Sequence, residues 1–285
     1  MNEHERYFFD INGYLIVRNC LTKSQIGDLS DRLEKQRRQE SKDVYGSDRT
    51  VGLSVSTEEW TAPSLLEWGG MYLDLVDIPT IAPYLESLLG VDYRLDHDYL
   101  AVITPDTPRR LYLHGGGQGA GGEKDIVGTT DGGQCYFRYH DGRFFNGLVA
   151  VAFELDDVSS DDGGFACIPG SHKANIPLPE DLRQSASQDD LSSMVTKVGV
   201  SSGDAIIFTE ALSHGTVPWS GTGERRTIFY KYTPHAVAWG PCFYNYRNYP
   251  GLTDNQIKML NSPGAFGGNQ RGGWGSIRER QVQDK

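Results

Sequence analysis

The sequence predicts a mainly β fold, an antiparallel barrel or jelly roll, and three observations support this class. The 285-residue chain holds 34 Gly, and aromatic residues make up 11% of it. Together with scattered Pro, this composition is typical of many turns and short strands. From about Tyr93 onward, short apolar runs are separated by loops rather than by regular helices. Strands connected in this way indicate an antiparallel arrangement rather than a parallel sheet.

Length and charge limit the class of protein. A chain of 285 residues suits one large domain with a sizeable core. The net charge of −11 argues against a nucleic-acid polymer as partner, because a phosphate backbone requires a basic face. The N-terminal residues lack the pattern of a signal peptide, and no window is apolar enough for a membrane span. The cysteines lie far apart and form no C-x-x-C pair, so we expect free thiols and a cytoplasmic location.

The expected organisation is a single domain over residues 1–285. Within it we expect a helical N-terminal layer over 1–90, a jelly-roll core over 91–240 and a C-terminal extension over 241–285. The aromatic segment Tyr244–Tyr249 fits either an ordered surface segment or a homodimer contact, and both interpretations stay open.

Local signals place the individual elements. A short apolar strand is expected at Gly13–Val17, followed by a helix from Thr22 to about Glu40, because Thr22 and Gln25 have the spacing of a capping box. A second helix is expected over Ile81–Leu89, ended by Gly90. The apolar runs expected to form the core strands are Tyr99–Ile103, Leu111–His114, Leu148–Leu155, Ala205–Phe208 and Arg226–Tyr232.

Two of the seven histidines have the context expected of metal ligands. His214 follows the strand Ala205–Phe208 and precedes Gly-Thr, and Arg225 begins the next strand eleven residues later. A hairpin of this size can return the guanidinium to the imidazole, where it can bind a carboxylate bidentately. His114 ends a strand and enters a Gly run, so its side chain can face a cavity. From context alone, a histidine in a turn and a surface arginine remain an alternative.

Three stretches carry a resemblance to the phytanoyl-CoA dioxygenase family of Fe(II)/2-oxoglutarate oxygenases. They are Leu113–Gly116 (LHGG), Asp162–Lys173 (DGGFACIPGSHK) and Gly203–Thr216 (GDAIIFTEALSHGT) running into Arg225. The resemblance implies a double-stranded β-helix, a cupin-like jelly roll. It also implies decarboxylation of 2-oxoglutarate to succinate and CO₂, coupled to functionalisation of an unactivated C–H bond with O₂.

The resemblance assigns roles to individual residues. Members of the family hold iron with a His-x-Asp/Glu pair and a distant His, which leaves three positions for 2-oxoglutarate and O₂. The two histidines correspond to His114 and His214. Arg225 corresponds to the arginine that binds the 2-oxoglutarate C5 carboxylate, and Thr216 to the hydroxyl residue that assists it. His172 has a structural role in the family pattern.

The carboxylate position of the family pattern is Gly116, which has no side chain to bind iron. The preferred interpretation is a halogenase-like site in which chloride takes the vacant position, with chlorination of an aliphatic C–H bond of a small molecule. A second is that Asp125, Asp131 or Asp141 fills the position, which makes the protein a hydroxylase or desaturase. The third is a non-catalytic binding module, against which the retained histidines and arginine argue.

The resemblance also suggests a substrate class. Halogenating relatives that act on free nucleotides make a nucleoside phosphate the leading expectation. The cations that can contact a phosphate are Arg109, Arg110, Lys124 and Arg143, although each also fits a solvated surface charge.

Overall fold

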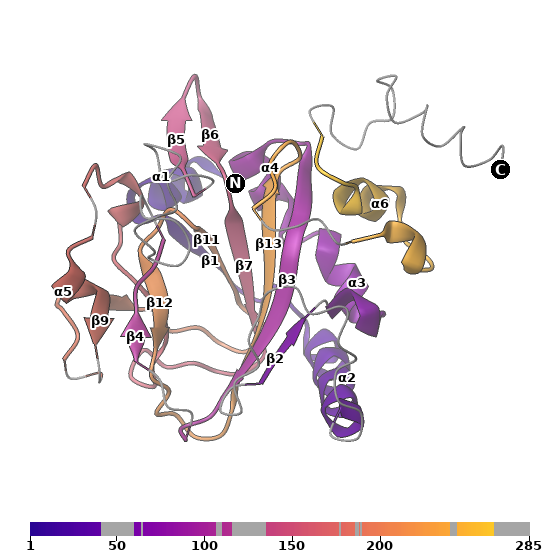
Figure 1. The fold of residues 1–285 in the computed structure, drawn as a ribbon, viewed down its shortest axis with the longest axis horizontal. Coiled ribbons are helices and arrows are strands. Elements are labelled where there is room, and N and C mark those ends of the chain that lie inside the picture. The colour runs from indigo at the N-terminus through magenta and orange to yellow at the C-terminus, as the bar shows by residue number, and fades with distance from the viewer. Residues whose placement is uncertain are drawn as a thin grey trace.

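Two antiparallel sheets face each other, and helices cover the outer face of the larger one (Figure 1). This is the arrangement of the computed structural model, which describes residues 1–40, 60–63, 65–106, 110–115, 135–176, 178–185, 188, 190–239 and 244–264. The mainly β, jelly-roll class predicted from the sequence is confirmed.

The larger sheet draws its strands from both ends of the chain. Its spatial order is β1 (Tyr14–Val17), β11 (Ala205–Thr209), β7 (Val149–Glu154), β13 (Arg225–Pro234), β3 (Tyr93–Ile103) and β2 (Trp60–Pro63). Every neighbouring pair is antiparallel. The expected strand at Gly13–Val17 is therefore present, and it pairs with β11 of the core rather than lying in a separate layer.

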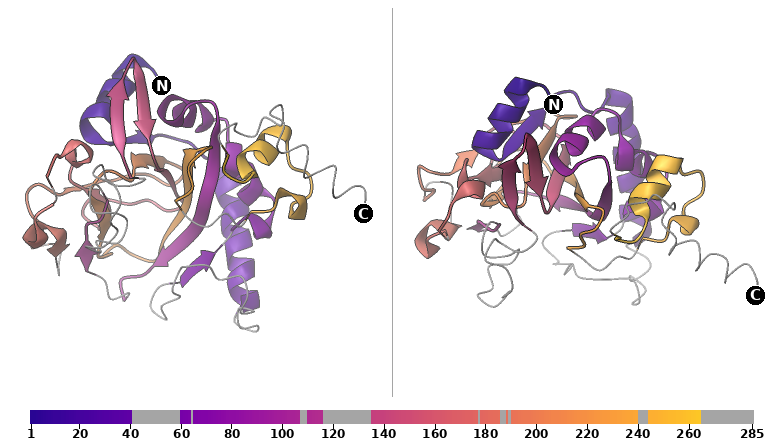
Figure 2. Two further views of the ribbon diagram at one scale, coloured as in Figure 1. Left: turned by 45° about the horizontal axis from the view of Figure 1, so that its top comes forward. Right: turned by 90° about the horizontal axis from the view of Figure 1, so that it is seen from above.

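The smaller sheet faces the larger one and contains the strand that begins at His214. It contains β10 (Thr196–Lys197), β8 (Gly164–Cys167) and β12 (His214–Val217). A neighbouring pair is formed by β4 (Leu111–Tyr112) and β9 (Gln184–Ser185). A hairpin of β5 (Phe137–His140) and β6 (Arg143–Asn146) stands beside the first helix (Figure 2).

The helices are α1 (Glu3–Asn12), α2 (Lys23–Glu40), α3 (Met71–Asp74), α4 (Ala82–Leu89), α5 (Glu180–Arg183) and α6 (Asp254–Leu260), with 3₁₀ turns η1 (Leu65–Trp68), η2 (Leu75–Asp77), η4 (Ser171–Lys173) and η5 (Tyr246–Asn248). The two helices predicted from the sequence are present as α2 and α4, among others that the sequence analysis did not predict. The backbone amide of Gln25 donates to Thr22 Oγ1 at 3.3 Å, and the amide of Thr22 donates to Gln25 Oε1 at 2.8 Å. This reciprocal pair is the predicted capping box. The amide of Gly90 closes α4 on the carbonyl of Glu86.

The cysteines and the helices bear on two further expectations from the sequence. Cys20, Cys135 and Cys167 are free and buried, while Cys242 lies outside the described residues. Within the described ranges, no helix combines the length and the apolar character needed to cross a bilayer.

The central strand β7 has two apolar faces with different neighbours. Val149, Val151 and Phe153 pack in the main core beneath the helices. Ala150 and Ala152 point the opposite way, into the space between the sheets. Because alanine fills little volume, this part of the inner wall leaves room for the side chains that face it.

The neighbouring strand β13 alternates in the same way. Ile228, Tyr230 and Tyr232 are fully buried under the helices, and Tyr230 donates to the carbonyl of Tyr72 at 2.5 Å. The residues that alternate with these three therefore project into the interior between the sheets. They are Arg225, Thr227, Phe229 and Lys231, so two cations are directed inward.

His172 joins the Ile-Pro-Gly-Ser-His-Lys segment to α1. Its side chain is buried, and its Nε2 donates to the carbonyl of Asp10 at 2.9 Å. Its ring meets Phe137 edge-on, with 4.5 Å between centroids. Next to it, Ser171 Oγ accepts from the amide of Ser213 at 2.8 Å. The segment thus supports the turn before His214, which agrees with the structural role expected for His172.

Replacing His172 should change how stability depends on pH. Burial lowers the pKa of His172 to about 4, from an ordinary value near 6.5. Between these two pH values the unfolded chain binds one more proton than the folded chain. The contribution of His172 to the free energy of unfolding is therefore fully present above about pH 6.5 and is lost as the pH falls toward 4. At about 1.4 kcal/mol per pKa unit, the free energy of unfolding falls by up to about 3 kcal/mol over this range. His172→Gln should remove that component from urea unfolding curves of the metal-free protein.

His140→Gln is the matched control for this experiment. The His140 side chain is 55% exposed on the β5–β6 hairpin, so its replacement removes no buried ring. Its stability profile should follow that of the parent protein. If the His172→Gln profile also runs parallel to the parent, the acid dependence has another source.

Candidate functional site

His114 and His214 are held opposite each other by the backbone. The amide of His114 donates to the carbonyl of His214 at 2.9 Å, and the amide of His214 donates to the carbonyl of His114 at 2.9 Å. The two residues form an antiparallel bridge between the end of β4 and the start of β12. Residues paired in this way project side chains to the same face, and the two ring centroids lie 4.3 Å apart.

Each imidazole is oriented by a carbonyl two residues earlier in the chain. His214 Nδ1 lies 2.7 Å from the carbonyl oxygen of Leu212, and His114 Nδ1 lies 3.4 Å from that of Tyr112. With Nδ1 donating to these carbonyls, Nε2 of each ring carries the free lone pair. A carbonyl bonded to one ring nitrogen and a metal bonded to the other is the usual arrangement of a histidine ligand.

Glu210 brings a carboxylate to the same point. It lies in the turn between β11 and β12, where its amide donates to the carbonyl of Leu148 at 3.0 Å and the amide of Leu212 closes the turn on Thr209 at 3.0 Å. The turn directs Glu210 back toward its own chain, so that Oε2 lies 3.7 Å from His214 Nε2. One ligand atom from each of His114, Glu210 and His214 lies within 4.8 Å of the others.

The glycines after the two histidines allow this close packing. A Cβ on Gly115 would lie 2.3 Å from the carbonyl oxygen of Leu212, and its φ of +102° disfavours other residues. A Cβ on Gly215 would lie 2.6 Å from the carbonyl oxygen of Tyr112. Both His-Gly pairs therefore allow one backbone to pack directly against another.

The electrostatics of the three groups suit a divalent cation. Burial lowers the pKa of His214 to about 3, and it also lowers the pKa of His114. Burial alone would raise the pKa of Glu210, but the adjacent ammonium of Lys231 holds it below its usual range. At neutral pH the set is two neutral imidazoles and one carboxylate, the protonation state that metal binding requires.

Glu210 keeps capacity for a further ligand. Its Oε1 lies 2.7 Å from Lys231 Nζ, whereas Oε2 is directed toward the imidazoles, 3.7 Å from His214 Nε2. A cation placed between Glu210 and the imidazoles would complete the coordination of this carboxylate. Two imidazoles and one carboxylate with open positions form the donor set typical of non-haem Fe(II) centres.

Arg225 lies at the other end of the same interior. It is 1% exposed, and its Nη2 lies 2.5 Å from Glu154 Oε1. Thr227 donates to the second oxygen of Glu154 at 2.8 Å. Arg225 Nε and Nη1 have no hydrogen-bond partner among the described residues. A buried guanidinium with two donor atoms unsatisfied is suited to bind an anion.

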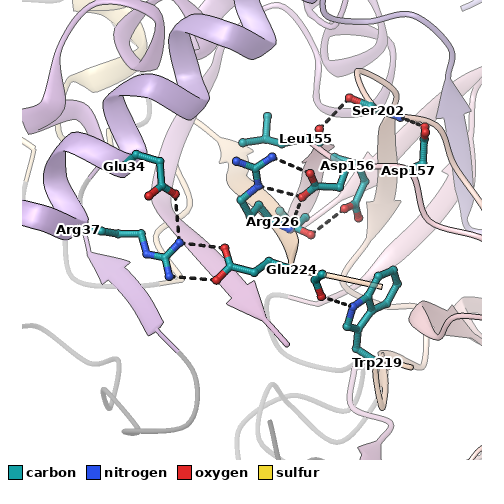
Figure 3. A network of polar contacts seen from close by, with 12 residues as sticks. Glu34, Arg37, Leu155, Asp156, Asp157, Ser202, Trp219, Glu224 and Arg226 are labelled. Carbon is teal, nitrogen blue, oxygen red and sulfur yellow. Dashed lines mark hydrogen bonds and ion pairs between the residues drawn. The ribbon is translucent and has the colours of Figure 1, made fainter. Parts of the chain in front are cut away.

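The two residues that flank Arg225 in sequence, Glu224 and Arg226, are each held by an ion pair (Figure 3). Glu224 accepts two hydrogen bonds from Arg37 of α2, at 2.9 and 3.0 Å. Arg226 donates to Asp156 through Nε at 3.0 Å and Nη2 at 2.6 Å. Because both flanking side chains are held on the outer face, strand alternation directs Arg225 to the inner one.

Thr216 is two residues after His214 on β12, so the two side chains share a face. The next residue, Val217, is paired with Gly164 of β8, and Arg225 Nε lies 3.2 Å from the point that a Cβ on Gly164 would occupy. The structure thus brings His114 and His214 together, with Thr216 on the face of His214 and Arg225 beside the strand paired with β12.

The remaining expected residues do not join this cluster. Gly116, Asp125, Asp131, Arg109 and Lys124 lie outside the described residues. Arg110 and Arg143 are exposed, and Asp141 is 91% exposed on the β5–β6 hairpin.

Glu210 was not singled out by sequence reasoning. Its one signal is the Glu-x-x-x-His spacing to His214, which is uninformative until a turn is known to lie between them.

Comparison with known proteins identifies the relationship. The model of the family "Phytanoyl-CoA dioxygenase (PhyH)" matches residues 133–227, a third of the chain that includes Glu210, His214 and Arg225. This match confirms the resemblance expected from the sequence. No curated protein is significantly similar to the chain.

Solved structures confirm the fold. HygX from Streptomyces hygroscopicus, with nickel, 2-oxoglutarate and hygromycin B bound, has a TM-score of 0.64 at 24% identity, covering 82% of this chain and 88% of that one. AviO1 from Streptomyces viridochromogenes Tue57 has a TM-score of 0.56 at 21% identity, covering 84% and 97%. SnoK, a non-haem α-ketoglutarate-dependent carbocyclase from nogalamycin biosynthesis, has a TM-score of 0.56 at 14% identity, covering 89% and 91%.

Replacing Glu210 should weaken metal binding far more than replacing Asp141. Glu210→Gln keeps the shape of the side chain but removes its charge. Loss of one charged member of a buried set costs about 3–5 kcal/mol, which is more than about a hundredfold in affinity. Anaerobic calorimetric titration with Fe(II) measures the affinity of each variant. Asp141→Asn changes one of the three carboxylates named from the sequence, and this variant should bind Fe(II) as tightly as the parent protein. The reverse ranking would remove Glu210 from the metal centre.

Proposed function

We propose that this chain, whose residues 133–227 match the phytanoyl-CoA dioxygenase family, is an Fe(II)- and 2-oxoglutarate-dependent oxygenase that holds iron with His114, Glu210 and His214. The observation that carries the proposal is the convergence of two oriented imidazoles and one buried carboxylate within 4.8 Å. The family match and the fold shared with HygX, which has been solved with iron and with nickel and 2-oxoglutarate, support the same type of function.

The residues present also fit 2-oxoglutarate. Arg225 offers unsatisfied donors for one carboxylate, and Thr216 shares a face of β12 with His214. Val217 and His214 are three residues apart on β12, or roughly 10 Å at about 3.3 Å per residue. That span suits an extended five-carbon dicarboxylate with one end at the guanidinium and the other at the metal. Glu154 balances the charge of Arg225 in the absence of the ligand.

The protein's own groups position reactants and exclude water. The carbonyls of Leu212 and Tyr112 orient the imidazoles, and the turn at Thr209–Leu212 places Glu210. Phe208 packs against the ring of His214 with 4.6 Å between centroids, which shields one side of the centre from solvent. When bound, iron and 2-oxoglutarate supply the activation of O₂ for oxidation of a substrate C–H bond.

Glu210 bears directly on the choice between hydroxylation and chlorination. The argument for chlorination rests on Gly116, which leaves the family carboxylate position without a side chain. Glu210 supplies a carboxylate from a different place in the chain, so the geometry favours hydroxylation or a related oxidation. This corresponds to the alternative in which a carboxylate from elsewhere completes the site, with Glu210 in place of Asp125, Asp131 or Asp141. Chlorination stays a prediction, as the second candidate.

The proposed substrate is a small organic molecule. HygX has been solved with hygromycin B, and SnoN, an epimerase with 17% identity, with nogalamycin RO. A nucleotide substrate and a homodimer stay predictions from the sequence. The exposed positions of Arg110 and Arg143 lend the nucleotide no additional support.

Replacing Arg225 should separate 2-oxoglutarate binding from metal binding. Arg225→Gln removes the charge at the dicarboxylate end and leaves all three metal ligands in place. We expect Fe(II) affinity close to that of the parent and 2-oxoglutarate affinity lowered by about a hundredfold, since a charged hydrogen-bonding partner is worth roughly 2–3 kcal/mol. Anaerobic titration of the visible charge-transfer band measures the second constant. The exposed Arg110→Gln is the control, and equal effects of the two variants would contradict the assignment.

Chloride distinguishes the two candidate reactions. In the Fe(II)–2-oxoglutarate complex of the parent protein, Glu210 should occupy the position that chloride would take, so the band should not respond to chloride. Glu210→Ala, loaded with excess Fe(II), should show a shift that saturates with chloride. A saturating shift in the parent protein would instead support chlorination at a vacancy left by Gly116.

A further inference from the structure

We propose that Lys231 is a positioning residue that holds one oxygen of Glu210 away from the metal, so that Glu210 binds through Oε2 alone and a coordination position stays open. The inference rests on the proposed function, because it concerns the same metal centre. It assigns a role to a buried lysine that none of the sequence motifs includes.

Lys231 is placed at the centre by its strand. It projects inward from β13, where its Cα partners are Ala150 of β7 and His97 of β3. Its side chain is 10% exposed, and Tyr99 lies beneath the ammonium, with 5.4 Å from Nζ to the ring centroid. The small Ala150 leaves the space in which the lysine side chain lies. The ammonium is thereby confined beside Glu210 rather than free to reach solvent.

The two oxygens of Glu210 face different partners. Oε1 lies 2.7 Å from Lys231 Nζ, and Oε2 lies 3.7 Å from His214 Nε2. The ammonium therefore neutralises the oxygen on the far side from the imidazoles. A carboxylate with one oxygen held by a cation is directed to bind a metal through the other. Three protein ligand atoms on an octahedral ion leave three positions, whereas a bidentate carboxylate would leave two.

Loss of the ammonium should shift two affinities in opposite directions. Without Lys231, Glu210 would be a buried carboxylate with no paired cation, and a positive charge near the metal would be gone. Both changes favour the metal, so Fe(II) should bind more tightly. Glu210 would then be free to bind through both oxygens, so 2-oxoglutarate should bind more weakly. A lysine that only stabilised the fold would not produce opposite shifts.

The experiment compares Lys231→Met with the parent protein under anaerobic conditions. Fe(II) affinity is measured by competition with a coloured chelator, and 2-oxoglutarate affinity by titration of the visible band of the Fe(II)-loaded protein. We expect Fe(II) affinity to rise by about tenfold and 2-oxoglutarate affinity to fall by about tenfold. The visible spectrum of the Co(II)-substituted protein gives an independent readout, because its intensity and position follow coordination number.

Controls separate the role of Lys231 from general effects. Lys258→Met removes an ion pair of the same length, 2.7 Å to Asp92, at the surface of α6, and should leave both affinities unchanged. Lys231→Gln provides a second uncharged variant in case the methionine disturbs folding, which thermal unfolding reports. In the Glu210→Gln background, Lys231→Met should leave 2-oxoglutarate affinity unchanged, because that effect requires Glu210 to change the way it binds the metal.

The outcomes are distinct. Opposite shifts in both uncharged variants, with the 2-oxoglutarate shift lost in the Glu210→Gln background, support the role. Unchanged affinities, or parallel losses, in variants that fold overturn it while leaving the proposed function in place. Absence of Fe(II) binding by the parent protein would overturn the proposed function and this inference with it.

Discussion

The reciprocal backbone hydrogen bonds between His114 and His214 are the contact on which the rest of the site depends. They join segments one hundred residues apart and place two imidazoles on one face at a fixed spacing. The glycine after each histidine makes the approach possible, because a Cβ at either position would meet a carbonyl oxygen. Glu210 then needs only the short turn before β12 to reach the same point.

The interior between the sheets is organised as two buried ion pairs. Lys231 pairs with Glu210 at the end near the histidines, and Arg225 pairs with Glu154 at the other. A buried charge without a partner is costly, so each cation requires its carboxylate when no ligand is bound. Each pair also keeps atoms for a further partner, Glu210 Oε2 beside His214 and two nitrogens of Arg225 that have no hydrogen-bond partner among the described residues. A metal and an anionic cosubstrate are complementary to these two pairs.

Much of the scaffold was predictable because its signals are local. The capping box at Thr22 and Gln25, the glycine that ends α4 and the apolar strand runs depend on neighbours in sequence. The short strands β5, β6 and β8 were not predicted, since four-residue elements are specified by their partners more than by their own composition. Lys231 was also given no role from the sequence, because strand alternation alone does not say which face of β13 is the interior.

The sequence by itself determined the fold class, the two histidines and the arginine, because each has a local pattern or a family motif around it. Only the tertiary structure decided which carboxylate stands beside the histidines. The family pattern points to Gly116 and the nearby aspartates, whereas the carboxylate comes from Glu210, ninety-six residues after His114. The reason is physical. A ligand set is defined by which side chains converge in space, and that convergence depends on the strand register between β4 and β12 and on one turn.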